Sequence, residues 1–530
     1  MFRFCLIILS LVSYTSFAQS PNVVWQKTFG GTSGDLLYDL IACSDGNYLL
    51  TGRSHSTASG NCTETTNGLT DYWVVKVDEE GTIIWQNKYG GNEIDNLYTA
   101  IETSDGGFLL IGISDSPPSG DKTAPHYGSD DIWAVKIDSA GAVIWDKTFG
   151  GDSLEFIHNG IVTDYGYILA SQSYSGVSGN KTTPNIGASD IWLVGIDFSG
   201  NILWQKSYGG NGGERPTGII KTSDNHVLIS GISNSSNSGD FSNDSYGYAD
   251  CWVLKLDING NLLWEQNYGG SNSDKANKVT ETPDGNYILV GTSNSPISGV
   301  KNSVHYGNDD VWVLKIDSNG ALLWEESYGG AQEDSAFNII TTNNGYFIVG
   351  SSSSGISGNK TTPAYGTCEY CYDFWGFKID GNGAILWQKS IGGTASDGCN
   401  SIVQNTDGSY LLAGSSSSPI SGTKTVASYG DSDYWLVKLK ADDLAINNFE
   451  NHTFTMYPNP VKGYLNIELP AQTNEVVVEL YSLLGQRIFK KTYYNQKNIE
   501  IDCSFISEGF FYVTFTVNNQ KYNRKLIKKN

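Results

Sequence analysis

All fourteen tryptophans of this chain fall into two series that repeat about every 60 residues. The first series contains Trp25, Trp85, Trp145, Trp204, Trp264, Trp324 and Trp387. The second series contains Trp73, Trp133, Trp192, Trp252, Trp312, Trp375 and Trp435. A constant period of this length is typical of architectures in which one supersecondary unit is stacked many times. The spacing therefore predicts seven copies of one unit.

One unit, read from Asp131, has the pattern of four short strands. Residues 132–138 form the first run, a second run ends at Gly150-Gly151, a third ends in a tight turn, and a fourth covers 167–172. Short β-branched and aromatic runs bounded by Gly, Asn, Asp and Ser are typical of strands joined by hairpins. A polar loop of about seventeen residues, 173–189, separates this unit from the next.

The four strands of one unit predict a small antiparallel sheet, which is not stable by itself. Stacking seven such sheets buries their faces, so we predict an all-β fold in which residues 22–440 form a seven-bladed β-propeller. We expect the long loop to lead from the outer strand of one blade to the inner strand of the next. We expect the last strand, 434–440, to be innermost and three N-terminal strands to complete its blade, which removes a free edge.

The pattern Asp-x-x-Gly-x-x-x-Trp recurs in the units, as at Asp138 to Trp145. It resembles the tryptophan-docking repeat of quinoprotein propellers, with a turn one residue shorter, and is similar to the sixty-residue "delta" repeats of extracellular bacterial proteins. The resemblance covers about residues 23–440. It implies the fold and says little about activity, and the vicinal cysteines of the quinone enzymes are missing.

The formal net charge of −23 excludes two classes of partner. Nucleic acids and anionic lipid surfaces both require a basic face, which this composition does not provide. No nucleic-acid partner is therefore expected. An acidic surface suits a protein that is soluble outside the cell.

The N-terminus has the three parts of a secretory signal peptide. One positive charge at Arg3 precedes a short apolar run, and Ser16-Phe17-Ala18 forms a small-x-small cleavage site before Gln19. We expect cleavage between Ala18 and Gln19, so that residues 1–18 are removed. The apolar run is too short to span a bilayer, and we expect no transmembrane segment.

The repeat ends near Lys440, and residues 441–453 read as a polar linker. Residues 454–530 contain about seven short alternating strands, which predict a small immunoglobulin-like β-sandwich. Cys503 and Phe511 also lie in this segment. The motif residues of this segment are Tyr457, Pro458, Asn459, Pro460, Gly485, Gly509, Lys525, Leu526, Ile527, Lys528 and Lys529.

These motif residues resemble the type A C-terminal sorting domain of the type IX secretion system of Bacteroidetes. The departures are Cys503, where an apolar residue is usual, and Phe511, where tyrosine is common. The resemblance implies that the segment addresses the folded protein to the outer-membrane translocon. It also implies that the protein is then attached to the cell surface or released.

Repeated acidic and basic residues favour structural roles. An aspartate precedes one strand of every unit, at Asp71, Asp131, Asp190, Asp250, Asp310, Asp373 and Asp433. We expect each to bind local backbone where the long loop enters the strand, with calcium binding or a carboxylate ring as the alternative. A lysine in the same strand predicts a repeated ion pair and is replaced in one unit by Gly195.

Function in a repeat array is expected where the units differ. Cys368 and Cys371 lie in an insertion in the sixth long loop, and a local disulfide is the preferred interpretation over a metal site because no second ligand pair is visible. Arg53 and His55 are unique to their unit, as are Glu214 and Arg215.

No catalytic residue or cofactor site is indicated by the sequence. A Ser/His/Asp signature is not visible. A catalytic pair of carboxylates that comes together only in the folded protein cannot be recognised from the sequence. The leading hypothesis is a non-catalytic binding or adhesion protein whose propeller loops contact an extracellular glycan or protein. The alternative is a secreted hydrolase or lyase acting on polysaccharide.

Overall fold

The computed structural model describes residues 20–368, 370–441, 455–482, 487–517 and 520–529. Every regular element within these ranges is a β-strand. The chain divides into two compact units, with the division between Asp442 and Asp443. The predicted signal peptide and its cleavage site at Ala18 and Gln19 lie outside the described residues, as does most of the predicted linker.

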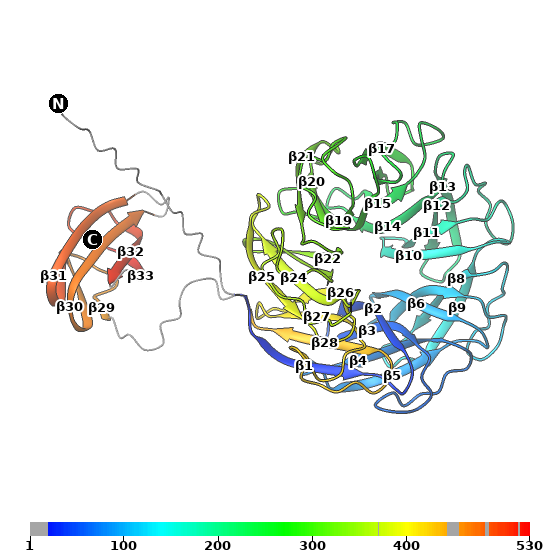
Figure 1. Ribbon diagram of the computed structural model, residues 1–530, viewed down its shortest axis with the longest axis horizontal. Helices are drawn as coiled ribbons and strands as arrows, with labels where there is room; N and C mark the ends of the chain where they lie inside the picture. The colour runs from blue at the N-terminus through cyan, green and yellow to red at the C-terminus, as the bar shows by residue number, and fades with distance from the viewer. Residues whose placement is uncertain (1–19, 369, 442–454, 483–486, 518–519, 530) are drawn as a thin grey trace. The chain divides into compact units, whose positions relative to one another are not determined.

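The first unit is a propeller of seven four-stranded antiparallel sheets, arranged around a common centre (Figure 1). The innermost strands, which contact one another around the axis, are β2 (Asp35–Ala42), β6 (Asp95–Glu102), β10 (Glu155–Val162), β14 (Glu214–Lys221), β18 (Asp274–Glu281), β22 (Asp334–Thr342) and β26 (Asp397–Gln404). The second strands are β3 (Tyr48–Ser54), β7 (Phe108–Ser114), β11 (Gly166–Ser173), β15 (Val227–Ser233), β19 (Tyr287–Ser293), β23 (Gly345–Ser352) and β27 (Tyr410–Ser416).

The two remaining strands of each blade carry the two tryptophan series. The third strands are β4 (Asp71–Val77), β8 (Asp131–Ile137), β12 (Asp190–Asp197), β16 (Asp250–Leu256), β20 (Asp310–Ile316), β24 (Asp373–Ile379) and β28 (Asp433–Leu439). The outer strands are β5 (Ile83–Tyr89), β9 (Val143–Phe149), β13 (Ile202–Tyr208), β17 (Leu262–Tyr268), β21 (Leu322–Tyr328), β25 (Ile385–Ile391) and, in the seventh blade, β1 (Val23–Phe29).

The expected order of strands within a blade was wrong. The run at Asp131 is the third strand of its blade, and the long loop joins the second and third strands of one blade, as from β11 to β12. The chain crosses between blades in the short Gly-Gly segment instead, as from Phe149 to Glu155. About five extended residues span roughly 16 Å, enough for three strand spacings of about 4.8 Å.

The ring closes with one N-terminal strand, not the three that we expected. β1 pairs with β28, so the seventh blade has the order β26-β27-β28-β1 from the axis outward (Figure 1). The last repeat therefore lacks only its outer strand, and β28 is third in its blade rather than innermost. Pairing of the two chain ends protects the edges that an open array would leave exposed.

The core of the propeller lies between blades. Each pair of neighbouring blades encloses its own apolar cluster, and the third-strand tryptophans are at most 1% exposed. The outer-strand tryptophans are half-buried, except Trp387, which is buried. They pack on the turn of the next blade, as Trp25 does at Gly81. Tyr89 adds a hydrogen bond from its hydroxyl to the carbonyl of Gly141 at 2.6 Å.

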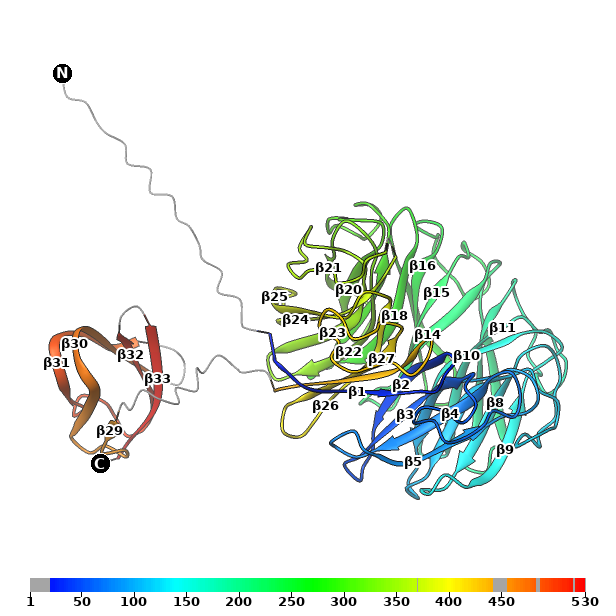
Figure 2. The same ribbon diagram turned by 60° about the horizontal axis from the view of Figure 1, so that its bottom comes forward.

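The second unit is one curled five-stranded sheet. Its strands are β29 (Thr455–Tyr457), β30 (Tyr464–Ser482), β31 (Arg487–Asp502), β32 (Gly509–Val517) and β33 (Gln520–Lys528). β30 pairs with β29, β31 and β32 along its length, and β30 and β31 bend together (Figure 2). Residues from both halves of β30, such as Ile467 and Val478, share one apolar cluster with Leu526. The sheet thus curls around a core of its own.

Candidate functional site

The first candidate site is the Tyr-Pro-Asn-Pro motif, which is bonded to the last strand. Asn459 donates a hydrogen bond from Nδ2 to the carbonyl of Lys525 at 2.8 Å, and its Oδ1 accepts one from the Ile527 N–H at 2.9 Å. Val461 continues the contact, because its N–H donates to the Ile527 carbonyl at 2.7 Å. The two ends of the sorting motif, 66 residues apart at Asn459 and Lys525, therefore form one structure.

Other motif residues join the same end of the sheet. The Nζ of Lys528 donates to the carbonyl of Lys462 at 2.8 Å, and the Lys529 N–H donates to Val461 at 2.9 Å. Gly509 pairs with Lys528 across β32 and β33. Gly485 lies outside the described residues. Tyr457 is 52% exposed, so its ring is available at the surface.

The two departures from the family pattern lie in the core. Cys503 is 1% exposed and Phe511 is 7% exposed, and both belong to the apolar cluster of the second unit. Burial raises the pKa of the Cys503 thiol, so this residue behaves as a small apolar side chain. Neither substitution disturbs the contact between Asn459 and the last strand.

The second candidate, the series of third-strand aspartates, is built into the blades. Each is buried, and one carboxylate oxygen accepts a backbone N–H from the long loop, as Asp131 does from Tyr127 at 2.7 Å. Burial raises the pKa of Asp131 to about 7, and the charge of Glu155 adds to the rise, although the Tyr127 N–H opposes it. His126 lies 3.2 Å from the same carboxylate.

The sequence analysis did not identify a second series of carboxylates. The first residue of every inner strand is a buried Asp or Glu, namely Asp35, Asp95, Glu155, Glu214, Asp274, Asp334 and Asp397. Glu155 accepts hydrogen bonds from the Gly151 N–H at 2.9 Å and the Ser173 hydroxyl at 2.8 Å. The signal that identifies this series is a Ser-x-Ser pair that recurs at the end of every second strand, as at Ser173 and Ser175.

Four of the strand lysines form ion pairs with the hairpin turn between the first two strands of their own blade. Lys136 lies 3.0 Å from Asp105, and three further pairs are Lys76–Asp45, Lys255–Asp224 and Lys315–Asp284. The third blade has Gly195 in place of the lysine, and there Lys221 from the next inner strand lies 2.9 Å from Asp164. The neighbouring blade thus supplies the missing cation.

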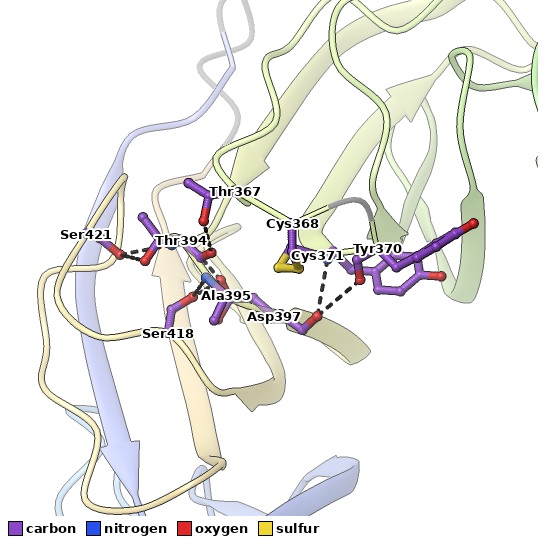
Figure 3. Close-up of a disulfide and its surroundings, with 12 residues drawn as sticks. Thr367, Cys368, Tyr370, Cys371, Thr394, Ala395, Asp397, Ser418 and Ser421 are labelled. Carbon is purple, nitrogen blue, oxygen red and sulfur yellow. Dashed lines mark hydrogen bonds between the residues drawn. A yellow bond between two sulfur atoms is a disulfide. The ribbon is translucent and has the colours of Figure 1, made fainter.

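The cysteines of the sixth long loop form a disulfide, with Cα atoms 5.1 Å apart at Cys368 and Cys371 (Figure 3). Thr367 beside it donates from its N–H at 3.2 Å and its hydroxyl at 3.0 Å to the carbonyl of Thr394. Thr394 belongs to the segment that crosses from the sixth to the seventh blade. The described cysteines outside this loop are buried free thiols.

Two of the residues that differ between units, Arg53 and Arg215, lie near the axis at the long-loop end of their blades. Arg53 donates from Nη1 to Asn96 at 3.3 Å and lies over the Tyr38 ring. Arg215 is half-buried on β14, on the inner ring of strands. His55 binds the carbonyl of Gly34 near the surface. Glu214, which the sequence analysis took as unique to its unit, is instead a member of the series of buried inner-strand carboxylates.

Two properties of the described residues bear on other classes of site. No group of three or more His, Cys, Asp or Glu side chains is placed to hold a metal ion within the ranges that the structure describes. Within the same ranges, no helix is long and apolar enough to cross a membrane.

Comparison with protein families identifies the second unit. Residues 455–529 match the secretion system C-terminal sorting domain. This is the sorting domain of the type IX system, and it directs export to the cell surface or secretion. It also implies interaction with the type IX secretion machinery.

Similarities of the propeller are weaker. The regulatory protein FlaEY of Caulobacter vibrioides is 26% identical over 200 residues, which cover 36% of this chain and 21% of that protein. A protein of unknown function from Dyadobacter fermentans is 11% identical, with a TM-score of 0.40 over 80% of this chain and 99% of that one. Puromycin hydrolase is 10% identical, with a TM-score of 0.43 over 83% of this chain and 59% of that one. These values give no information about activity.

Proposed function

We propose that the propeller is a non-catalytic binding or adhesion module whose long-loop face contacts an extracellular glycan or protein. The observation that carries this proposal is the placement of exposed aromatic rings. Every long loop leaves the same end of its blade, and these loops expose Tyr127, Tyr174, Tyr246, Tyr248, Tyr370 and Tyr429. Exposed tyrosine side chains combine stacking with hydrogen bonding, which suits recognition of polar ligands.

The long loops are held in place before any ligand binds. Ser119 and Lys122 exchange two backbone hydrogen bonds of 3.0 Å within the second loop. The equivalent positions of the other long loops form the same backbone bridge. The buried carboxylate of Asp131 then fixes the end of that loop through the Tyr127 N–H. Because ordering a loop costs conformational entropy on binding, prior order favours affinity.

Export is proposed to proceed in two steps. Residues 1–18 direct passage into the periplasm and are removed between Ala18 and Gln19, and the sorting domain then engages the type IX translocon. Surface display should be lost in a translocon-deficient strain. Normal display in that strain would contradict the second step.

The binding proposal is tested on a glycan array with product analysis on the same polysaccharides. Tyr248→Ser, at a ring that is 78% exposed on the long-loop face, should weaken binding about tenfold. Tyr165→Ser is the matched control, because Tyr165 is 70% exposed in a turn at the opposite end of its blade. Turnover of a polysaccharide would replace the proposal with the hydrolase or lyase alternative.

A further inference from the structure

Two arginines lie near the propeller axis, although the whole chain is strongly acidic. Arg53 and Arg215 are at the long-loop end of their blades, at paired or equivalent positions. Glu214, beside Arg215 in sequence, is buried and bound by the Gly210 N–H at 2.9 Å and by Ser233. It therefore does not neutralise Arg215.

Among the residues that the structure describes, His158 lacks the partner that a buried polar group normally has, and the half-buried Arg215 on the neighbouring inner strand is unpaired. Arg215 makes no hydrogen bond or ion pair with any residue that the structure describes. His158 lies on β10, and β10 is next to β14 (Figure 1). Its Nε2 is enclosed without a hydrogen-bond partner in the described part of the chain. Burial, with repulsion from Arg215, lowers the pKa of His158 to about 3, so the imidazole is neutral.

The missing partner of His158 is specific to its blade. His158 occupies the bulge of its inner strand, where the fifth blade has Asn277. Asn277 donates from Nδ2 to the carbonyl of Ala336 on the next inner strand at 2.8 Å, and the Thr217 hydroxyl bonds Ala276 in the same way. His158 makes no such bond. An unmet buried polar group destabilises the folded state, and a ligand that satisfies it would recover that free energy.

Aromatic and amide groups border this pair. Phe156 is half-buried and packs on the apolar cluster between the second and third blades. Tyr174 is 42% exposed and close enough to Arg215 to affect the pKa of the guanidinium. Gln172 donates to the Tyr174 hydroxyl at 3.1 Å and to Ser189 at 2.8 Å, which holds the ring at the edge of the site.

We propose that Arg215 and His158 bind the carboxylate of an acidic saccharide at the long-loop end of the axis, with Phe156 and Tyr174 contacting the sugar rings. This rests on the proposed binding function and names its ligand class. A guanidinium binds a carboxylate through two parallel hydrogen bonds, and a neutral imidazole has one N–H to donate. Aromatic faces beside polar groups are typical of ligand sites that orient a partly apolar ring.

The test measures binding of oligogalacturonate, oligoalginate and oligoglucuronate to the exported protein by calorimetry. At least one should bind, its methyl ester should bind at least tenfold more weakly, and Arg215→Gln should cause a similar loss. Lys275→Gln is the control, because Lys275 is exposed and faces Asp309. It should change affinity less than threefold. Thermal unfolding checks the fold of both variants, and Arg215→Gln should not lower the melting temperature because it removes a half-buried charge that has no ion-pair partner among the described residues.

Three results would overturn the site. These are no binding of any of the three acids, equal binding of acid and ester, or equal binding by Arg215→Gln and the unaltered protein. Tighter binding of a polyglutamate peptide would replace the saccharide with an acidic protein. Binding of neutral glycans alone would remove this site but leave the proposed function intact, whereas loss of all glycan and protein binding would remove both.

Discussion

The Nζ of Lys88 donates a hydrogen bond to the carbonyl of Ser56, at the place that a long-loop lysine fills in other blades. In the second blade, Lys122 donates to the carbonyl of Ser116 at 2.6 Å. The first blade has Cys62 at the loop position, so its buried amine comes from the outer strand instead. Two unrelated positions thus supply the buried amine in six blades, whereas the fourth blade has Phe241 in the loop and Asn267 in the outer strand.

Lys88→Met should lower the free energy of unfolding by about 3 kcal/mol, because Asp71 and its neighbours would lose a buried cation. Calorimetry on the exported protein measures the change. Lys27→Met, at an exposed position of β1, is the control and should stay within about 0.5 kcal/mol. Equal effects of the two substitutions would show that the buried amine is not needed.

Gly30→Ala should destabilise the propeller by about 3 kcal/mol, since a Cβ there would lie 1.8 Å from Oδ1 of Asp433. Gly34→Ala, in the same crossing segment, should be tolerated because no atom lies within 4 Å of its Cβ position. Thermal unfolding of both variants checks this. A stable Gly30→Ala protein would mean that Asp433 is free to move.

The propeller should become more stable as the pH falls from 8 to 5. Burial raises the pKa of Asp71, Asp250, Asp373 and Asp433 to about 6 and that of Asp131 to about 7, above the value of about 3.9 in an unfolded chain. The folded protein therefore binds more protons between about pH 4 and 7, and stability is lost as the pH rises through the folded pKa values.

Melting temperatures at pH 8, 7, 6 and 5 in 0.5 M salt measure this dependence, because salt screens the surface charges and leaves the buried ones. Asp71→Asn should flatten the profile. Carboxyl groups with lowered pKa, such as Asp105 at about 2, contribute a loss only below about pH 4. His158, whose pKa burial lowers to about 3, offsets part of the gain below about pH 6, because the unfolded chain then binds a proton that the folded chain does not. A melting temperature that falls between pH 8 and 5 would contradict the prediction.

Asn459→Ala should reduce the fraction of protein at the cell surface. It removes the hydrogen bonds to Lys525 and Ile527 and should cost the sorting unit about 2 kcal/mol. Surface labelling of cells that produce the full chain measures the fraction. Asn498→Ala, at an exposed position of β31, should leave display unchanged, and an equal loss there would argue against a specific role for Asn459.

Removal of residues 443–530 should leave the propeller folded and retain it in the periplasm. The apolar cluster of the second unit contains no residue from the propeller, so truncation exposes no propeller core. Thermal unfolding and cell fractionation of the truncated protein give the two measurements. A large drop in melting temperature, or undiminished surface display, would each contradict one part of the expectation.

Much of the architecture follows from local patterns. The tryptophan spacing correctly predicted seven blades, since each repeat encodes the same strands and turns. The motif from Tyr457 to Lys529 correctly indicated the sorting domain because its residues are characteristic one by one.

The order of strands could not be read in this way. A repeated sequence has no marked beginning, so any of its four strands can be taken as the first, and the run at Asp131 was placed first rather than third. Only hydrogen bonds between distant segments settle the choice, as β1 does by pairing with β28 more than 400 residues away.

Local sequence thus determined the number of blades, the strand content and the export address of this protein. Tertiary structure decided which strands line the axis, how the ring closes, which cations lie beside the buried carboxylates, and that His158 lies near Arg215. These features depend on contacts between blades. Such contacts depend on how the sheets stack in space, and spacing along the chain does not encode that.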